Sequence, residues 1–353
     1  MSLAEDLKRD YEEKFKEREV SVKIALIGQP GAGKSSLINK LIGREIFEVG
    51  VQTDTTIEVQ ERKLDNNLTI VDLPGYGTSM FPIEQWLKKF QPEQYDLYLF
   101  VFDGKLHDSD AVLFDNLKRW RDEREHPFFI VRNKEDQIWD DFKNLEQLQL
   151  EIAQDVSSKM KSFSEKIYFT SCRKNTGIEE LKQDIFNSDL PRVKKSKLIF
   201  EFKATSKQDL DNKRQICLDH LNYYAYGGAA NAINPIPGVD VAVDLGVITD
   251  MFFEIRKTFG INEEVQTALA KYEILTPAVK TVFNYVSKAG VTKLIEKVGA
   301  RFVSKELVKY VPIAGWAISA ISGYYLIKKL GESYIDDCYR VAELYLDNFV
   351  ARK

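Results

Sequence analysis

The chain has 353 residues and a formal net charge of −4, and its 44 % hydrophobic content supplies core material for about two domains. This slightly acidic balance argues against a general nucleic-acid binder, which needs clustered positive charge. The cysteines form no CxxC pair and only three histidines are present, which indicates reduced thiols in a cytosolic protein and disfavours a structural zinc site. The cysteines are Cys172, Cys217 and Cys338.

Residues 1–19 predict a short amphipathic helix. Apolar residues recur every four positions among charged ones, at Leu3, Leu7, Tyr11 and Phe15. We expect this stripe to pack on the helical part of the same protein rather than on a membrane or a partner helix. The segment has too much charge for a signal peptide, and Ser2 stands where N-myristoylation requires glycine.

A phosphate-binding pattern follows the first predicted strand, residues 22–27, and precedes residues 36–42, which have helical spacing. Between them stands GQPGAGKS, which matches GxxxxGK[ST]. Its glycines let backbone N–H groups turn toward phosphate oxygens at the positive end of the helix. We expect Lys34 to contact the β and γ phosphates and Ser35 to bind Mg²⁺. The candidate phosphate-loop residues are Gly28, Gly31, Ala32, Gly33, Lys34, Ser35 and Ser36.

A threonine-rich loop and a β-hairpin come next. Alternation from Ile57 to Leu64, an Asn66-Asn67 turn and a second strand over residues 68–71 are typical of a hairpin. A GTPase places in the preceding loop the threonine that completes magnesium coordination and senses the γ phosphate. Thr56 or Thr55 is the candidate for this metal-binding and catalytic role, and Thr53 is the next choice.

The sequence from Asp72 to Gly75 matches DxxG directly after that strand. We expect Asp72 to hold the magnesium shell and the Gly75 N–H to meet the γ phosphate. Tyr76 follows, where Ras-type GTPases carry a glutamine that orients the attacking water. Slow basal hydrolysis is therefore expected, with the water positioned by backbone groups, the substrate phosphate or a second molecule. Residues that could reach such an interface are Arg44, Glu84, Asp103 and Lys105.

A guanine-reading motif is predicted farther along, after a strand at 97–102, a helix at 108–124 and a strand at 128–132. There Asn133-Lys134-Glu135-Asp136 matches NKxD. Asp136 can accept two hydrogen bonds from the guanine edge that adenine lacks, while Asn133 and Lys134 brace the ring and the phosphate loop. A strand at 167–170 leads into Ser171-Cys172-Arg173, a looser form of the loop whose N–H contacts the guanine carbonyl, and a helix at 178–187 closes the domain.

Strands that alternate with helices, with motifs at their C-terminal ends, predict a doubly wound, mostly parallel α/β sheet with an antiparallel edge from the hairpin. Four motifs in this order indicate a P-loop GTPase that binds GTP or GDP with Mg²⁺, and Asn133 and Asp136 disfavour an ATP-using enzyme. We place this domain at residues 20–191 and an all-helical domain at 192–353.

Strand alternation ends after residues 198–202, and helical segments fill the rest of the chain. The uncharged run 310–327 is 18 residues long, shorter than the roughly 20 that a membrane-spanning helix needs. We expect it to be a buried central helix. Reversible membrane contact through residues 310–327 or the uncharged stretch 222–239 stays open.

The chain resembles the immunity-related GTPases, the interferon-inducible group of the dynamin-like class, over most of residues 20–220. The resemblance rests on DLPGYG at 72–77 with Phe81-Pro82, Tyr95-Asp96, FFIVR at 128–132, SDLP at 188–191 and KRQ at 213–215. It implies a helical domain built from both chain ends, GTP-dependent assembly through the nucleotide faces and action at intracellular membranes. Asn133 stands where many members carry threonine, and the N-terminal extension is shorter.

The leading hypothesis is therefore a GTP-hydrolysing protein that forms a homodimer or oligomer through its nucleotide face. It would be cytoplasmic or peripheral on membranes, with no nucleic-acid partner. The alternative is a monomeric Era-like switch that binds a protein or ribosomal partner. The acidic charge and the absence of a basic GXXG module argue against that alternative.

Overall fold

The computed structural model describes residues 9, 12–13, 15–48, 59–77, 81–160, 165–230, 245–272, 274, 276–285, 289–292, 294 and 315–350. These residues fall into two compact units. The first is Val20–Lys203, and the second combines the described residues of Met1–Glu19 and of Ala204–Lys353. The division lies after Lys203 rather than after residue 191, where we expected it.

One six-stranded sheet, in the order β2-β3-β1-β4-β5-β6, forms the centre of the first unit. Its strands are β1 (Val22–Gly28), β2 (Gln60–Lys63), β3 (Leu68–Asp72), β4 (Leu97–Phe102), β5 (Phe128–Arg132) and β6 (Ile167–Phe169). Only the pair of β2 with β3, joined by the turn η1 (Asp65–Asn67), is antiparallel. The predicted sheet with a hairpin edge is therefore confirmed. Because the parallel strands end at one edge, the motifs that follow them lie together there.

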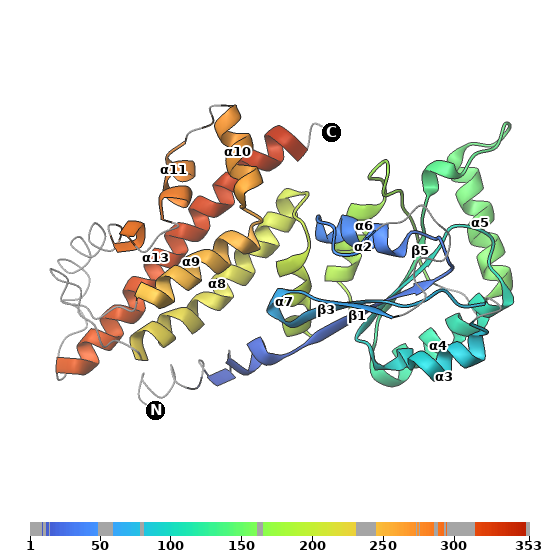
Figure 1. Ribbon diagram of the computed structural model, residues 1–353, viewed down its shortest axis with the longest axis horizontal. Coiled ribbons are helices and arrows are strands. Elements are labelled where there is room, and N and C mark those ends of the chain that lie inside the picture. Colours follow the sequence, from blue (N-terminus) through green and yellow to red (C-terminus); the bar gives the residue numbers. More distant parts are fainter. Residues whose placement is uncertain are drawn as a thin grey trace. The chain divides into compact units, whose positions relative to one another are not determined.

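Helices cover both faces of this sheet, with α2 and α6 on one face and α3 and α4 on the other (Figure 1). The helical segments are α2 (Lys34–Ile42), α3 (Ile83–Phe90), η2 (Pro92–Gln94), α4 (Asp108–Arg124), η3 (Glu135–Gln137), α5 (Leu145–Lys159), α6 (Ile178–Phe186) and α7 (Arg192–Glu201). The apolar cluster on one face includes Leu26, Leu37 and Leu181, and the cluster on the other includes Trp86 and Leu113. Burial of these side chains is what fixes the helices on the sheet.

The alternation at residues 198–202 predicted a strand, and this prediction is wrong, because most of this stretch is the end of the helix α7. Leu198 and Phe202 are four positions apart, and both are buried in the cluster that contains α2 and α6. A short apolar run satisfies strand and helix spacing equally, and packing decides between them. Since α7 belongs to this core, the first unit extends to Lys203.

The second unit is helical, as predicted. Its helical segments are α8 (Lys207–Ala230), α9 (Leu245–Thr258), α10 (Glu263–Lys271), α11 (Pro277–Asn284), α13 (Gly315–Tyr345) and the π-helical turn η5 (Leu346–Val350). The long helices α8, α9 and α13 run side by side, and α11 packs on α13 (Figure 1). Their core includes Leu221 and the rings of Phe252 and Tyr334, which stack 4.0 Å apart.

The N-terminal segment packs on this helical unit where the structure describes it. Arg18 donates a 2.8 Å hydrogen bond to Glu254 on α9, and its guanidinium lies 4.5 Å from the centre of the Tyr223 ring on α8. Of the predicted apolar stripe, only Phe15 lies among the described residues, and its side chain is 47 % exposed. Arg18, a charged residue that the stripe does not include, therefore makes part of the contact to the helical unit.

The uncharged run 310–327 contributes its residues 315–327 to α13, and Tyr324, Leu326 and Ile327 are buried in the helical core. Residues 310–314 and 231–239 lie outside the described residues. Within the part of the chain that the structure describes, no helix is long and apolar enough to cross a membrane.

Candidate nucleotide-binding site

The phosphate loop connects β1 to α2 with a backbone that only glycine permits at two positions. Gly28 has φ +147°, and a Cβ there would lie 1.8 Å from the Val101 carbonyl oxygen of β4. Gly33, the residue before α2, has φ +85°, and a Cβ there would lie 2.5 Å from Nδ2 of Asn133. The loop therefore closes against β4 and the NKxD segment, with the N-terminus of α2 open to an anion.

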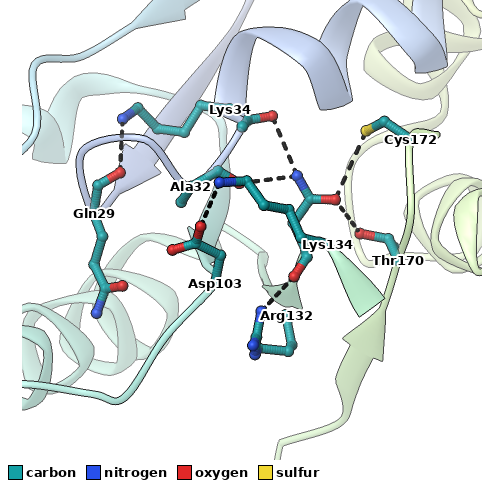
Figure 2. Close-up of polar contacts among 10 residues, drawn as sticks. Gln29, Ala32, Lys34, Asp103, Arg132, Lys134, Thr170 and Cys172 are labelled. Carbon is teal, nitrogen blue, oxygen red and sulfur yellow. Dashed lines mark hydrogen bonds and ion pairs between the residues drawn. The ribbon is translucent and has the colours of Figure 1, made fainter. Parts of the chain in front are cut away.

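Lys34 folds back over this loop and is buried. Its Nζ lies 3.4 Å from the Gly28 carbonyl oxygen and 3.3 Å from that of Gln29, and the contact to Gln29 is visible in Figure 2. These bonds are long, so phosphate oxygens would be better partners for the ammonium group. The geometry fits the predicted role of Lys34 at the β and γ phosphates.

Ser35 and Asp72 meet beside the loop, at the ends of α2 and β3. The Ser35 hydroxyl donates a 2.5 Å hydrogen bond to Oδ2 of Asp72, which is fully buried. Oδ1 of Asp72 has no partner among the described residues. Burial raises the pKa of Asp72, and the charge of Lys34 opposes that shift. A hydroxyl beside a buried carboxylate with an unused oxygen is a donor set that Mg²⁺ prefers, so both residues fit the ion.

The threonine candidates Thr53, Thr55 and Thr56 lie outside the described residues. Gly75 is described and lies against the phosphate loop, since a Cβ there would be 2.5 Å from Cγ of Pro30. Tyr76 is buried, and its hydroxyl donates a 2.7 Å hydrogen bond to Asp110 of α4. That hydroxyl is therefore committed to α4 instead of facing a water at the γ phosphate.

Asn133 ties three segments of the site together. Its Nδ2 donates to the Ala32 carbonyl at 2.9 Å, and its Oδ1 accepts from Thr170 at 3.1 Å and from the Cys172 thiol at 3.7 Å. Figure 2 shows Ala32 of the phosphate loop on one side, and Thr170 and Cys172 of the segment after β6 on the other. Asn133 thus braces the phosphate loop as its motif predicts.

Lys134 has a left-handed backbone, with φ +56°, and its Nζ forms a 2.5 Å ion pair with Asp103 after β4 (Figure 2). The preceding Arg132 donates to the Asn133 carbonyl (Figure 2). These contacts hold the NKxD backbone from two sides.

Asp136 lies at the rim of the site with Ser171, whose hydroxyl donates to it at 2.5 Å. This bond is the main cause that lowers the pKa of Asp136, with smaller contributions from Arg173 and Lys174. Asp136 is therefore an ionised acceptor, as guanine recognition requires. Cys172 has a pKa raised by burial to about 11, so its thiol stays protonated and is no nucleophile near pH 7.

Sequence reasoning missed the supporting roles of several residues, although it named Asp103 as an interface candidate. Gln29 donates at 2.9 Å to Asp110 and at 3.0 Å to the Lys105 carbonyl, and Thr170 and Asp103 support Asn133 and Lys134. For Asp103 and Thr170 a signal existed, because each directly follows a predicted strand or ends one at the ligand edge. No local pattern pointed to Gln29 and Asp110.

The comparison with known proteins gives a family match within the first unit. Residues 23–134 match the family model described as 50S ribosome-binding GTPase. Interferon-gamma-inducible GTPase 10 of Mus musculus is 35 % identical over 127 residues, which are 34 % of this chain and 30 % of that protein. Interferon-inducible GTPase 1 of Mus musculus is 27 % identical over 270 residues, 70 % of this chain and 63 % of that protein. The chain therefore spans less than two thirds of either relative.

Among solved structures, Era of Aquifex aeolicus bound to GDP.AlF4⁻ is 22 % identical with a TM-score of 0.34. The alignment covers 56 % of this chain and 68 % of the Era chain. Toc33 of Arabidopsis thaliana is 15 % identical with a TM-score of 0.36. That alignment covers 48 % of this chain and 78 % of the Toc33 chain. The family match falls on the segment that carries the phosphate loop, Asp72 and Asn133. Val20–Lys203 accordingly has the fold of a P-loop GTPase domain, its residues 23–134 match a GTPase family model, and its site residues fit GTP or GDP with Mg²⁺.

Proposed function

We propose that this protein hydrolyses GTP to GDP and phosphate and assembles through its nucleotide face when GTP is bound. The observation that carries the proposal is the burial of Tyr76, whose hydroxyl is bonded to Asp110. The position after Gly75 therefore offers no group to orient the attacking water, and a second copy docked across the nucleotide would supply one. Similarity to interferon-inducible GTPases over 70 % of the chain supports the same reading.

Of the four interface candidates, two already have partners within the chain. Arg44 pairs with Glu201 at 3.1 Å, and Asp103 pairs with Lys134 at 2.5 Å. Lys105 and Glu84 are exposed, and the Lys105 backbone carbonyl accepts the Gln29 amide of the phosphate loop. We therefore favour Lys105 as the cation that reaches the nucleotide of a second copy, because it lies at the edge of the phosphate loop and can neutralise transition-state charge.

Light scattering coupled to size-exclusion chromatography tests assembly. The protein is compared alone, with GDP and with a non-hydrolysable GTP analogue, at several protein concentrations. A mass increase only with the analogue, together with a specific hydrolysis rate that rises with protein concentration, is expected. Fast turnover that is independent of protein concentration would contradict the proposal.

Lys105→Ala is the first variant, and Lys88→Ala, an exposed lysine of α3, is its matched control. We expect Lys105→Ala to abolish the concentration-dependent part of hydrolysis while single-copy GTP binding stays within about twofold, since an in-trans cation acts mainly on the transition state. Equal behaviour of the two variants would exclude Lys105 from this role.

A second candidate function is a monomeric switch that binds a ribosomal or protein partner. The match of residues 23–134 to the 50S ribosome-binding GTPase model favours it specifically. A monomer in all three nucleotide states, with co-sedimentation on ribosomes only in the GTP-analogue state, would support this function in place of assembly.

Action at intracellular membranes is the remaining part of the proposal and rests on the family resemblance. Flotation with liposomes of mixed neutral and anionic lipids, in GDP and in the GTP analogue, measures it directly. Co-flotation with the analogue is the expected result, and a protein that stays at the bottom of the gradient in both states would remove membranes from the proposal.

A further inference from the structure

Asp110, in the first turn of α4, is a fully buried carboxylate that accepts hydrogen bonds from three places in the first unit. Gln29 of the phosphate loop donates to Oδ2 at 2.9 Å, and the His107 backbone N–H donates to the same oxygen at 2.6 Å. Tyr76, directly after Gly75, donates to Oδ1 at 2.7 Å. The carboxylate thus bridges the loop that holds the phosphates to the loop that follows DxxG.

The segment from Pro74 to Gly77 is fixed from two sides. Gly75 lies against the phosphate loop, and a Cβ on Gly77 would come within 2.5 Å of the Ser109 hydroxyl on α4. On the other side, the Trp86 indole N–H donates to the Pro74 carbonyl at 2.8 Å, and its ring lies edge-on to Tyr76 at 5.4 Å. The Gly75 amide therefore lies in a backbone that has little room to move.

Asp110 needs all of its donors, because a carboxylate oxygen without a partner in a dry site carries the full cost of desolvation. Burial, and then the neighbouring Asp110, raise the pKa of Tyr76 far above its ordinary value, so the hydroxyl remains protonated and donates. Bonds from a hydroxyl or amide to a buried carboxylate are among the stronger hydrogen bonds in proteins. The three hydrogen bonds to Asp110 consequently fix the relative positions of the phosphate loop and the loop after DxxG.

We propose that Gln29, Tyr76 and Asp110 form a latch that holds the Gly75 N–H in place for the γ phosphate, which makes Tyr76 a positioning residue. The inference rests on the proposed GTPase function. GDP has no γ phosphate, so it gains nothing from a preset Gly75 amide, whereas GTP avoids the cost of ordering that loop. The latch therefore sets how strongly the site distinguishes GTP from GDP.

Tyr76→Phe tests the latch, since it removes one hydroxyl and keeps the ring beside Trp86. Equilibrium binding of fluorescent GDP and of a fluorescent non-hydrolysable GTP analogue is measured with Mg²⁺ on the full chain. We expect about a tenfold weaker Kd for the analogue, roughly 1.4 kcal/mol, with the Kd for GDP within about twofold of the unaltered protein. A merely structural role would weaken both nucleotides alike.

Tyr168→Phe is the matched control, because its hydroxyl also donates to a carboxylate, that of Asp184 at 2.8 Å, without touching the phosphate loop. It should leave the ratio of the two Kd values unchanged. Gln29→Met provides a second test, and the double variant with Tyr76→Phe should lose less than the sum of the single losses, as both act through Asp110.

Three results would overturn the latch: an unchanged ratio in Tyr76→Phe, a tighter Kd for the analogue, or losses in the double variant that simply add. If the unaltered protein binds neither fluorescent nucleotide, the proposed GTPase function itself fails, and that outcome is distinct from failure of the latch.

Discussion

At the scale of single residues, Asp136, which is expected to bind the guanine base, is a charged acceptor held by the hydroxyl of Ser171. The Ser171 hydroxyl at 2.5 Å lowers the pKa of Asp136, so the carboxylate is ionised near pH 7. An ionised carboxylate accepts hydrogen bonds at both of its oxygens, which suits the two donors on the edge of guanine.

Asp136→Asn is expected to invert this preference. An amide presents a donor where guanine also presents donors, so GTP affinity should fall by a factor of about a hundred or more, while xanthine nucleotides, which carry an acceptor there, gain. Competition of GTP and XTP against fluorescent GDP measures the change. Ser171→Ala is the control, since it removes the hydrogen bond to Asp136 but leaves the carboxylate as the acceptor for the base. If the variant keeps its preference for GTP, Asp136 does not read the base.

Much of this site was predictable from sequence because its residues lie in contiguous motifs. The Lys34, Asp72 and Asn133 positions follow from spacing and from the strand that precedes each of them. The latch was not predictable, because Gln29 and Asp110 are 81 positions apart and no local pattern links them. The absence of a water-orienting glutamine at Tyr76 could be predicted from sequence, but the partner of Tyr76 emerged only from the folded chain.

At the scale of elements, the short helix α3 holds the DxxG loop, which precedes it in the chain. Neither α3 nor α5 was singled out from the sequence, because both are short or sparsely apolar, and only Trp86 and Phe90 of α3 are buried. The fully buried Trp86 indole binds the Pro74 carbonyl inside the DxxG motif. The helix therefore connects the domain core directly to the γ-phosphate loop.

Trp86→Phe tests the contact between α3 and the DxxG loop, because it keeps an aromatic ring in the core and removes the indole N–H. Loss of the indole N–H leaves the buried Pro74 carbonyl without its donor, which costs about 1–3 kcal/mol in the free energy of unfolding. Urea denaturation followed by circular dichroism measures this cost. Trp139→Phe, which changes an exposed tryptophan, is the control and should unfold at the same urea concentration as the unaltered protein. Equal stability of the two variants would show that the indole bond to Pro74 does not stabilise the fold.

At the scale of the whole molecule, a partly buried polar cluster holds the N-terminal segment to the helical unit. Glu254 bonds Arg18 at 2.8 Å and His220 at 3.2 Å, and Tyr224 also donates to it. Burial by itself would raise the pKa of Glu254, but the hydrogen bond from His220 and the charge of Arg18 outweigh it, so the pKa is lowered from 4.5 to about 2.

This shift makes the stability of the second unit depend on pH in a defined direction. Because the pKa is lower in the folded state, Glu254 stabilises the fold above pH 4.5, and the contribution is lost as pH falls from there to about 2. Its full size is on the order of 3 kcal/mol. Glu254→Gln should therefore be less stable than the unaltered protein at pH 7, with the gap shrinking by pH 3. Urea midpoints at pH 7, 5 and 3 measure it, and a gap independent of pH would refute the assignment.

The helical unit takes its residues from both sides of the GTPase domain, which lies between Glu19 and Ala204 in the chain. During synthesis, residues 20–203 leave the ribosome complete, while Arg18 has already emerged and Glu254 has not yet been made. The segment that contains Arg18 therefore cannot form this contact until a residue 236 positions later in the chain has been made. Residues 20–203 can accordingly fold before the helical unit is complete, and a nascent chain interrupted before α13 would carry a finished nucleotide site on an unfinished helical unit.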